Sequence, residues 1–124
     1  MLRVMTTPDD YVEMQVTTLT EGLTRVALAG RLDTTGVDRI ETRFAATVVS
    51  GGQHAIVDLS RVTFIGSMGI RMLITAARSM RPRQTRLALY AAQSMVGEVL
   101  ESVSLNDLLP VVTSEADAIA ALTG

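Results

Sequence analysis

The sequence contains no cysteine and only one histidine, His54. Disulfide bonds and thiolate metal sites are therefore excluded, and so is a metal site built from several histidines. We expect neither a metal ion nor a cofactor. The lack of cysteine also favours a reducing compartment, so we expect a cytoplasmic protein.

Lysine is absent as well, and all eleven basic residues are arginine. We interpret this usage as codon bias in the source, because the arginines do not form a run. The formal net charge of −2 gives no electrostatic reason to expect nucleic acid as a direct partner.

No long apolar run is present. The longest uncharged stretch covers residues 44–57. It is interrupted by Ser50-Gly51-Gly52-Gln53 and is shorter than the ~20 residues that a membrane span needs. The first ten residues lack the apolar run of a signal peptide. We therefore expect no membrane insertion, with residues 1–10 as a flexible lead-in and residues 11–124 as one domain.

The apolar residues that are present follow a pattern typical of a folded domain. They make up 48% of the chain, against 19% charged residues. Val12, Met14 and Val16 alternate with polar neighbours, which predicts a half-buried strand. A turn at residues 20–22 and a second alternating segment at residues 24–29 follow. The chain is therefore predicted to open with a β-hairpin.

Apolar residues then recur at helical spacing in four segments. The positions are Val37, Ile40, Phe44 and Val48; Ile70, Leu73, Ile74 and Ala77; Val96, Val99, Leu100 and Val103; and Ile119 with Leu122. Ser114 and Asp117 form a capping box before the last segment. Short apolar runs at residues 55–57, 87–90 and 111–112 predict further strands. We therefore expect an α/β fold, with a mixed sheet of four to five strands and about four helices packed against it.

Two motifs carry a family resemblance. Residues 56–70 read IVDLSRVTFIGSMGI, and residues 28–33 read LAGRLD. They resemble the Asp-Leu-Ser-x-Val signature of STAS domains, which leads into a serine-containing loop and a helix, and the Gly-x-Leu-Asp that precedes the family's first helix. The order of elements fits from about Val12 to Leu122. The resemblance implies the STAS fold. Within that family, the two motifs are similar to those of anti-sigma factor antagonists.

Such proteins bind an anti-sigma factor, often itself a serine kinase, and so free a sigma factor. Phosphorylation in the loop before the second helix turns them off. The loop here reads Gly66-Ser67-Met68-Gly69, with methionine at the usual acceptor position. Some stressosome-type relatives carry the acceptor one place earlier, so the resemblance makes Ser67 the candidate phospho-acceptor. A helix N-terminus also accommodates phosphate. The alternative is that Ser67 is only the N-cap of the helix.

The same resemblance and the helical pattern together suggest a docking surface. At 100° per residue, Met68, Met72 and Ser79 fall opposite the predicted core face of their helix, with Arg71 and Arg78 on one flank. Adaptable methionines and arginines suit an interface. The predicted partner-binding residues are Asp33, Gly66, Ser67, Met68, Gly69, Arg71, Met72, Thr75 and Ser79. The alternative is that a neighbouring helix or the N-terminal lead-in covers the methionines.

Two aspartates have structural alternatives. The matched family position suggests that Asp33 steers the partner or repels a phosphate, and the structural alternative is that it caps the helix that follows it. Asp58 is expected to end its strand and to bond local amides in the Asp-Leu-Ser turn.

A serine-hydrolase function is not supported. The nucleophile elbow needs glycine two residues on either side of the serine, and Ile65 stands where one is required. A lone histidine gives a catalytic triad little support, so we expect a binding module and no enzyme. Two other functions stay open: a STAS subunit of a lipid-transport ABC assembly, and a stressosome-like scaffold. A weak homodimer is a further expectation.

Overall fold

The computed structural model describes residues 12–20 and 22–123, so the predicted lead-in over residues 1–10 lies outside the described part. The elements are β1 (Glu13–Thr20), β2 (Leu23–Leu32), α1 (Thr34–Val48), β3 (His54–Ile65), α2 (Ser67–Met80), β4 (Leu87–Tyr90), α3 (Ser94–Ser102), β5 (Val111–Val112) and α4 (Glu115–Thr123). Two short 3₁₀ turns, η1 (Arg81–Arg83) and η2 (Leu105–Asp107), follow α2 and α3. The predicted α/β class and the predicted opening hairpin are confirmed.

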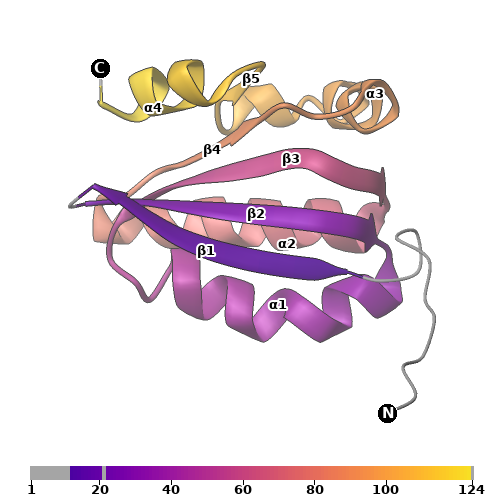
Figure 1. Cartoon of the computed structure of the whole chain (residues 1–124), viewed down its shortest axis with the longest axis horizontal. Helices are drawn as coiled ribbons and strands as arrows, with labels where there is room; N and C mark the ends of the chain where they lie inside the picture. Colours follow the sequence, from indigo (N-terminus) through magenta and orange to yellow (C-terminus); the bar gives the residue numbers. More distant parts are fainter. Residues whose placement is uncertain (1–11, 21, 124) are drawn as a thin grey trace, which may run out of the picture.

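The strands form one mixed sheet in the order β1-β2-β3-β4-β5. β1 pairs antiparallel with β2, and the remaining neighbours pair in parallel. α1 connects β2 to β3, and α2 connects β3 to β4. Because β2 and β3 run in parallel, they end at the same edge of the sheet, and both helices begin there (Figure 1).

The main core lies between the sheet and the pair of helices α1 and α2. All four predicted apolar positions of α1 are buried: Val37, Ile40, Phe44 and Val48. α3 adds Val96 and Leu100 to this core. A smaller cluster on the other face of the sheet joins α4 to β3 and β4, through Ile56, Tyr90 and Leu122 among others. The sheet is therefore covered on both faces, with α1 and α2 together on one of them (Figure 1).

The core-facing side of α2 differs from the prediction. Its buried residues are Gly69, Met72, Leu73, Ala76, Ala77 and Met80, while Ile70 and Ile74 are half-buried. The buried face is thus rotated by about a quarter turn toward Met72. The physical reason is that α2 packs against α1 as well as against the sheet, so its buried arc includes the side that faces α1.

Asp58 does not end its strand, contrary to the prediction. β3 continues to Ile65, and the pairing with β2 shifts register next to Asp58. The Asp58 side chain nevertheless accepts the predicted local bond, from the Ser60 amide at 2.8 Å. An irregularity of this kind re-aims side chains without stopping the strand.

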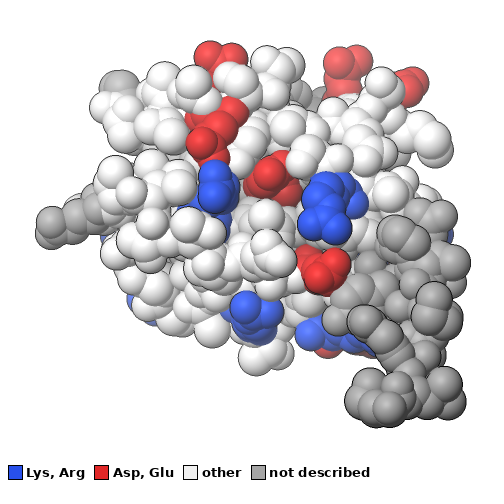
Figure 2. Space-filling view, in the orientation of Figure 1, with Lys and Arg blue, Asp and Glu red and all other residues white. Residues whose placement is uncertain are grey.

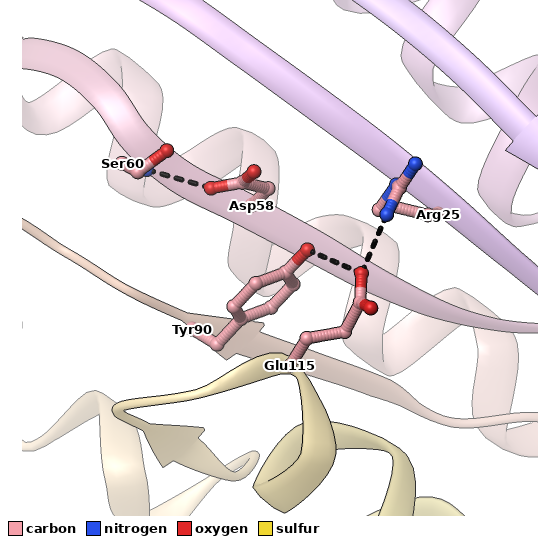
Figure 3. A network of polar contacts seen from close by, with 5 residues as sticks. All are labelled: Arg25, Asp58, Ser60, Tyr90 and Glu115. Carbon is pink, nitrogen blue, oxygen red and sulfur yellow. Dashed lines mark hydrogen bonds and ion pairs between the residues drawn. The ribbon is translucent and has the colours of Figure 1, made fainter.

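A polar network attaches α4 to the sheet (Figure 3). Arg25 on β2 and the hydroxyl of Tyr90 on β4 both donate to the same carboxylate oxygen of Glu115, at 2.7 Å and 3.1 Å. The bond from Arg25 holds the pKa of Glu115 below its usual range, and burial raises the pKa of Tyr90. On the surface around this network, positive and negative side chains alternate (Figure 2). That face of the sheet therefore presents no single sign of charge.

Candidate functional site

The predicted site residues Asp33 and 66–69 lie together where β2 and β3 end, whereas Arg71, Met72, Thr75 and Ser79 continue along α2. The Gly66 amide donates to the Leu32 carbonyl oxygen at 3.1 Å, which joins the two strand ends directly. Leu32 is followed by Asp33 and α1, and Gly66 by Ser67 and α2. Two helix N-termini therefore lie side by side, each with amides that have no partner within the helix and with the positive end of its dipole.

Asp33 is the N-cap of α1, as the structural alternative predicted. Its carboxylate accepts the Gly36 amide at 2.8 Å and pairs with the Arg31 guanidinium at 3.3 Å. The Gly36 amide is the main reason why the pKa of Asp33 is lowered, with Arg31 adding to it. The carboxylate is only partly exposed and stays ionised near neutral pH. Capping occupies one of its oxygens, and a role toward a partner stays a prediction.

Sequence reasoning missed Arg31 and Phe64. The Arg31 guanidinium lies 4.2 Å from the centre of the Phe64 ring, in cation–π geometry. A Cβ added to Gly66 would lie 3.2 Å from that ring. The contact holds a positive charge beside the two helix starts. Both residues belong to the quoted motifs, but only the parallel pairing of β2 and β3 shows that they meet.

Ser67 is the first residue of α2, and the N-cap is Gly66. The alternative of Ser67 as N-cap is therefore wrong, because the turn begins one residue earlier. The Ser67 side chain is exposed. Its place at the positive end of a helix favours an added anion there, which is consistent with the candidate acceptor.

Gly69 is buried and has no side chain to offer a partner, so its predicted place in the contact surface is wrong. A Cβ on Gly69 would lie 2.8 Å from Ile65 Cγ1 and 2.9 Å from the Leu32 carbonyl oxygen. The absence of a side chain lets α2 approach both strand ends. Gly69 therefore determines where Ser67 and the half-buried Met68 lie, because it allows the first turn of α2 to pack closely on the strand ends.

Met72 is 4% exposed and belongs to the main core, so its prediction as a surface residue is wrong. α1 covers it, as the structural alternative allowed. Arg71, Thr75 and Ser79 are exposed as predicted. The structure thus leaves an exposed strip on α2 that runs from Ser67 through Arg71 and Thr75 to Ser79, flanked by Met68.

The described residues contain no group of acids and histidines that could hold a metal ion. His54 begins β3 and Ser67 follows its end, a separation of about 35 Å along the strand. The His54 ring accepts the Arg86 amide at 3.0 Å instead. These two residues therefore cannot form a nucleophile–base pair. Within residues 12–20 and 22–123, no helix has the length and apolar character that crossing a membrane requires.

Comparison with known proteins adds a family and several relatives. A sequence model of the STAS domain matches residues 12–118. A Bordetella bronchiseptica protein described as an anti-sigma factor antagonist, BtrV, is 30% identical over 101 residues, which span 82% of this chain and 87% of that protein.

Two solved proteins share the fold. The structure of an anti-sigma factor antagonist from Mycobacterium paratuberculosis superimposes with a TM-score of 0.84 at 21% identity, covering 97% of this chain and 100% of that one. The Bacillus protein SpoIIAA in its unphosphorylated form gives a TM-score of 0.72 at 21% identity, covering 86% and 93% of the two chains. SpoIIAA has also been solved in a phosphorylated form, with a TM-score of 0.66 at 20% identity and coverage of 87% and 97%.

Proposed function

The chain belongs to the STAS domain family, and on that premise we propose that it is an anti-sigma factor antagonist, which binds an anti-sigma factor and so frees a sigma factor. The Bordetella relative and the Mycobacterium structure carry this function in their descriptions. These relatives are regulatory binding proteins, and the chain is accordingly a binding module and not an enzyme.

One observation carries the proposal: the exposed Ser67 stands at the N-terminus of α2, beside the capped N-terminus of α1. The partner contacts this end of the sheet through Asp33, through Gly66 and Ser67 at the start of α2, and through the exposed strip of α2. The main core lies beneath the strip, so binding needs no unfolding.

The proposed partner is an anti-sigma factor of the serine-kinase type, and phosphorylation of Ser67 is the proposed switch. A phosphate carries nearly two negative charges at neutral pH. At this position the helix dipole and the nearby Arg31 offset those charges, while Asp33 opposes them. The fold therefore tolerates the modification, while the surface of this chain that contacts the partner gains negative charge. SpoIIAA, which has been solved in both forms, supports a switch of this kind.

The test is a pull-down from the native cells with the tagged chain, followed by mass spectrometry of the partners and of the Ser67 peptide. The proposal expects a kinase-type anti-sigma factor in the bound fraction and phosphate on Ser67 in the unbound fraction. Ser67→Ala should remove the phosphate and stay in the bound fraction. Ser94→Ala is the matched control, because Ser94 is likewise the exposed first residue of a helix, and it should behave as the unchanged chain. The antagonist function is contradicted if transporter subunits are recovered and no anti-sigma factor is.

A second candidate, a STAS subunit of a lipid-transport ABC assembly, is favoured by Met68 alone. Methionine at the usual acceptor position removes the usual switch, and such a subunit does not need one. The same pull-down separates the two candidates, since their partners differ in kind.

A further inference from the structure

The charges of this chain are unevenly distributed along the sequence. Residues 59–97 contain six arginines and no acidic residue, whereas residues 98–124 contain five acidic residues and no basic one. Five of the six arginines lie on α2 or between α2 and β4, and all five are exposed: Arg71, Arg78, Arg81, Arg83 and Arg86. Ion pairs among the described residues involve only Arg25, Arg31 and Arg61. No described acid therefore neutralises the arginines of α2.

Part of this charge is arranged along one line. Arg71, Thr75 and Arg78 follow one another at i, i+4 and i+7, which places them on one exposed face of α2. We call these three residues, with Arg81 at the end of the helix, the basic ridge. Arg71 and Arg78 are two turns apart, about 10 Å along the helix axis. A binding partner would meet charges at helical spacing.

An apolar groove runs beside the basic ridge, between α1 and α2. It has a volume of about 170 Å³, and Phe44, Met72 and Ala76 are among the residues that line it. Thr75 and Ser79 form its boundary on the side of α2. Glu41 is the one acidic residue in its lining, and it stands on α1. A bound acid is therefore attracted to the α2 side of the groove and repelled from the α1 side.

We infer that the basic ridge and this groove form the docking surface for an acidic amphipathic helix of a partner protein. One apolar side chain of that helix fills the groove, and carboxylates spaced two turns apart pair with Arg71 and Arg78. That the partner is an anti-sigma factor rests on the proposed function. The chemistry of the surface does not, because it follows from the charges and the groove.

The observations favour a protein over nucleic acid. The ridge is narrow and interrupted by the uncharged Thr75, and the groove beside it is apolar. Glu41, on the α1 side of the groove, lies where a polyanion would also approach. A helix with acids along one edge avoids Glu41, whereas a phosphate backbone of uniform charge does not.

The test uses the full chain, labelled for NMR, and a synthetic helical peptide with glutamates two turns apart and a leucine between them. A second peptide has lysine in place of each glutamate. We expect the acidic peptide to perturb resonances of Arg71, Thr75, Arg78 and Ser79, and the lysine peptide to leave them unchanged. Raising the salt concentration should weaken binding of the acidic peptide, because salt screens the attraction between exposed charges.

Charge reversal provides the decisive variant. The R71E/R78E variant should have an affinity for the acidic peptide that is lower by about tenfold or more. It should also gain affinity for the lysine peptide. R39E is the matched control, because Arg39 is an exposed arginine on α1 outside the groove lining. Its circular dichroism and that of R71E/R78E establish that both variants fold.

Three results would overturn the inference. The first is no binding of the acidic peptide up to millimolar concentration, and the second is equal binding of both peptides. The third is that duplex DNA or phosphatidylglycerol vesicles bind in place of the peptide, in a way that depends on Arg71 and Arg78. Titration of the recovered anti-sigma factor separates this inference from the proposed function. If R71E/R78E binds that factor as the unchanged chain does, the antagonist function stands and the ridge is not its docking surface.

Discussion

Gly69 on α2 lies so close to Leu32 at the end of β2 that a Cβ atom at Gly69 would come within 2.9 Å of the Leu32 carbonyl oxygen. The same carbonyl accepts the Gly66 amide. One backbone oxygen therefore fixes how α2 starts beside α1. The position of Ser67 depends on this approach.

Replacing Gly69 by alanine should destabilise the fold by about 1–3 kcal/mol, since backbone and buried atoms must move to admit the methyl group. Urea unfolding measures this change. Gly97→Ala in α3 is the control, because its added Cβ would meet only the Ala92 Cβ, at 4.0 Å. That variant should be neutral or up to ~1 kcal/mol more stable. Equal effects at both glycines would contradict the close approach.

Two substitutions at Asp33 separate capping from charge. Asp33→Ala removes the acceptor for the Gly36 amide and should cost about 1 kcal/mol of unfolding free energy. Asp33→Asn keeps a capping oxygen and should cost only a fraction of that. If Asp33 also steers the anti-sigma factor, Asn should slow association while leaving stability nearly unchanged. Unfolding curves and binding kinetics report the two effects, and an unstable Asn variant would argue against the capping geometry.

Glu115 should give the fold a pH-dependent stability. Its pKa is lowered in the folded state, mainly by the bond from Arg25, so its contribution is fully present above the unfolded pKa, near 4.5. The contribution disappears as the pH falls below that value through the folded pKa. Because both side chains are partly exposed, we expect Glu115→Gln to cost only about 0.5–1 kcal/mol at pH 7.

The difference between Glu115→Gln and the unchanged chain should therefore shrink between pH 5 and pH 3 in thermal unfolding. Glu101→Gln on α3 is the matched control, because Glu101 is exposed and in none of the ion pairs among the described residues. It should show little difference at either pH. A gap for Glu115→Gln that stays constant with pH would show that Arg25 does not stabilise the carboxylate.

Ser67→Asp should mimic the proposed phosphorylated state in part. An acid in the first turn of a helix stabilises it by about 0.3–1 kcal/mol, so the variant should unfold no earlier than the unchanged chain. Its affinity for the anti-sigma factor should fall by at least about tenfold, because a charge enters the contact surface. Ser94→Asp, at the same position of α3, should keep full affinity. Equal affinities of the two variants would contradict a switch at Ser67.

The overall fold could be predicted from the sequence, because the spacing of apolar residues indicates the helices and strands. The location of the site at the ends of β2 and β3 could also be predicted, because parallel strands end at one edge of a sheet. The face of α2 could not. Its apolar pattern allows Ile70 and Ile74 or Met72 and Ala76 to face inward, and only the packing of α1 against α2 decides between them. The sequence pattern therefore predicts Met72 on the surface, although it lies in the core.

The errors at Ser67 and Asp58 have a similar origin. Serine is a better N-cap than glycine by propensity, but the chain enters α2 through Gly66, whose amide is held by Leu32. Asp58 bonds its local amide as a turn residue does, yet pairing with β2 carries the strand onward. In both cases a contact from a distant segment overrides the local preference.

The proposed antagonist function can be measured by adding the purified chain to a complex of the recovered anti-sigma factor with its sigma factor and following the free sigma factor. We expect release in proportion to added chain, unchanged release with Ser94→Asp, and little release with Ser67→Asp. A complex that stays intact at saturating concentrations of the unchanged chain would contradict it.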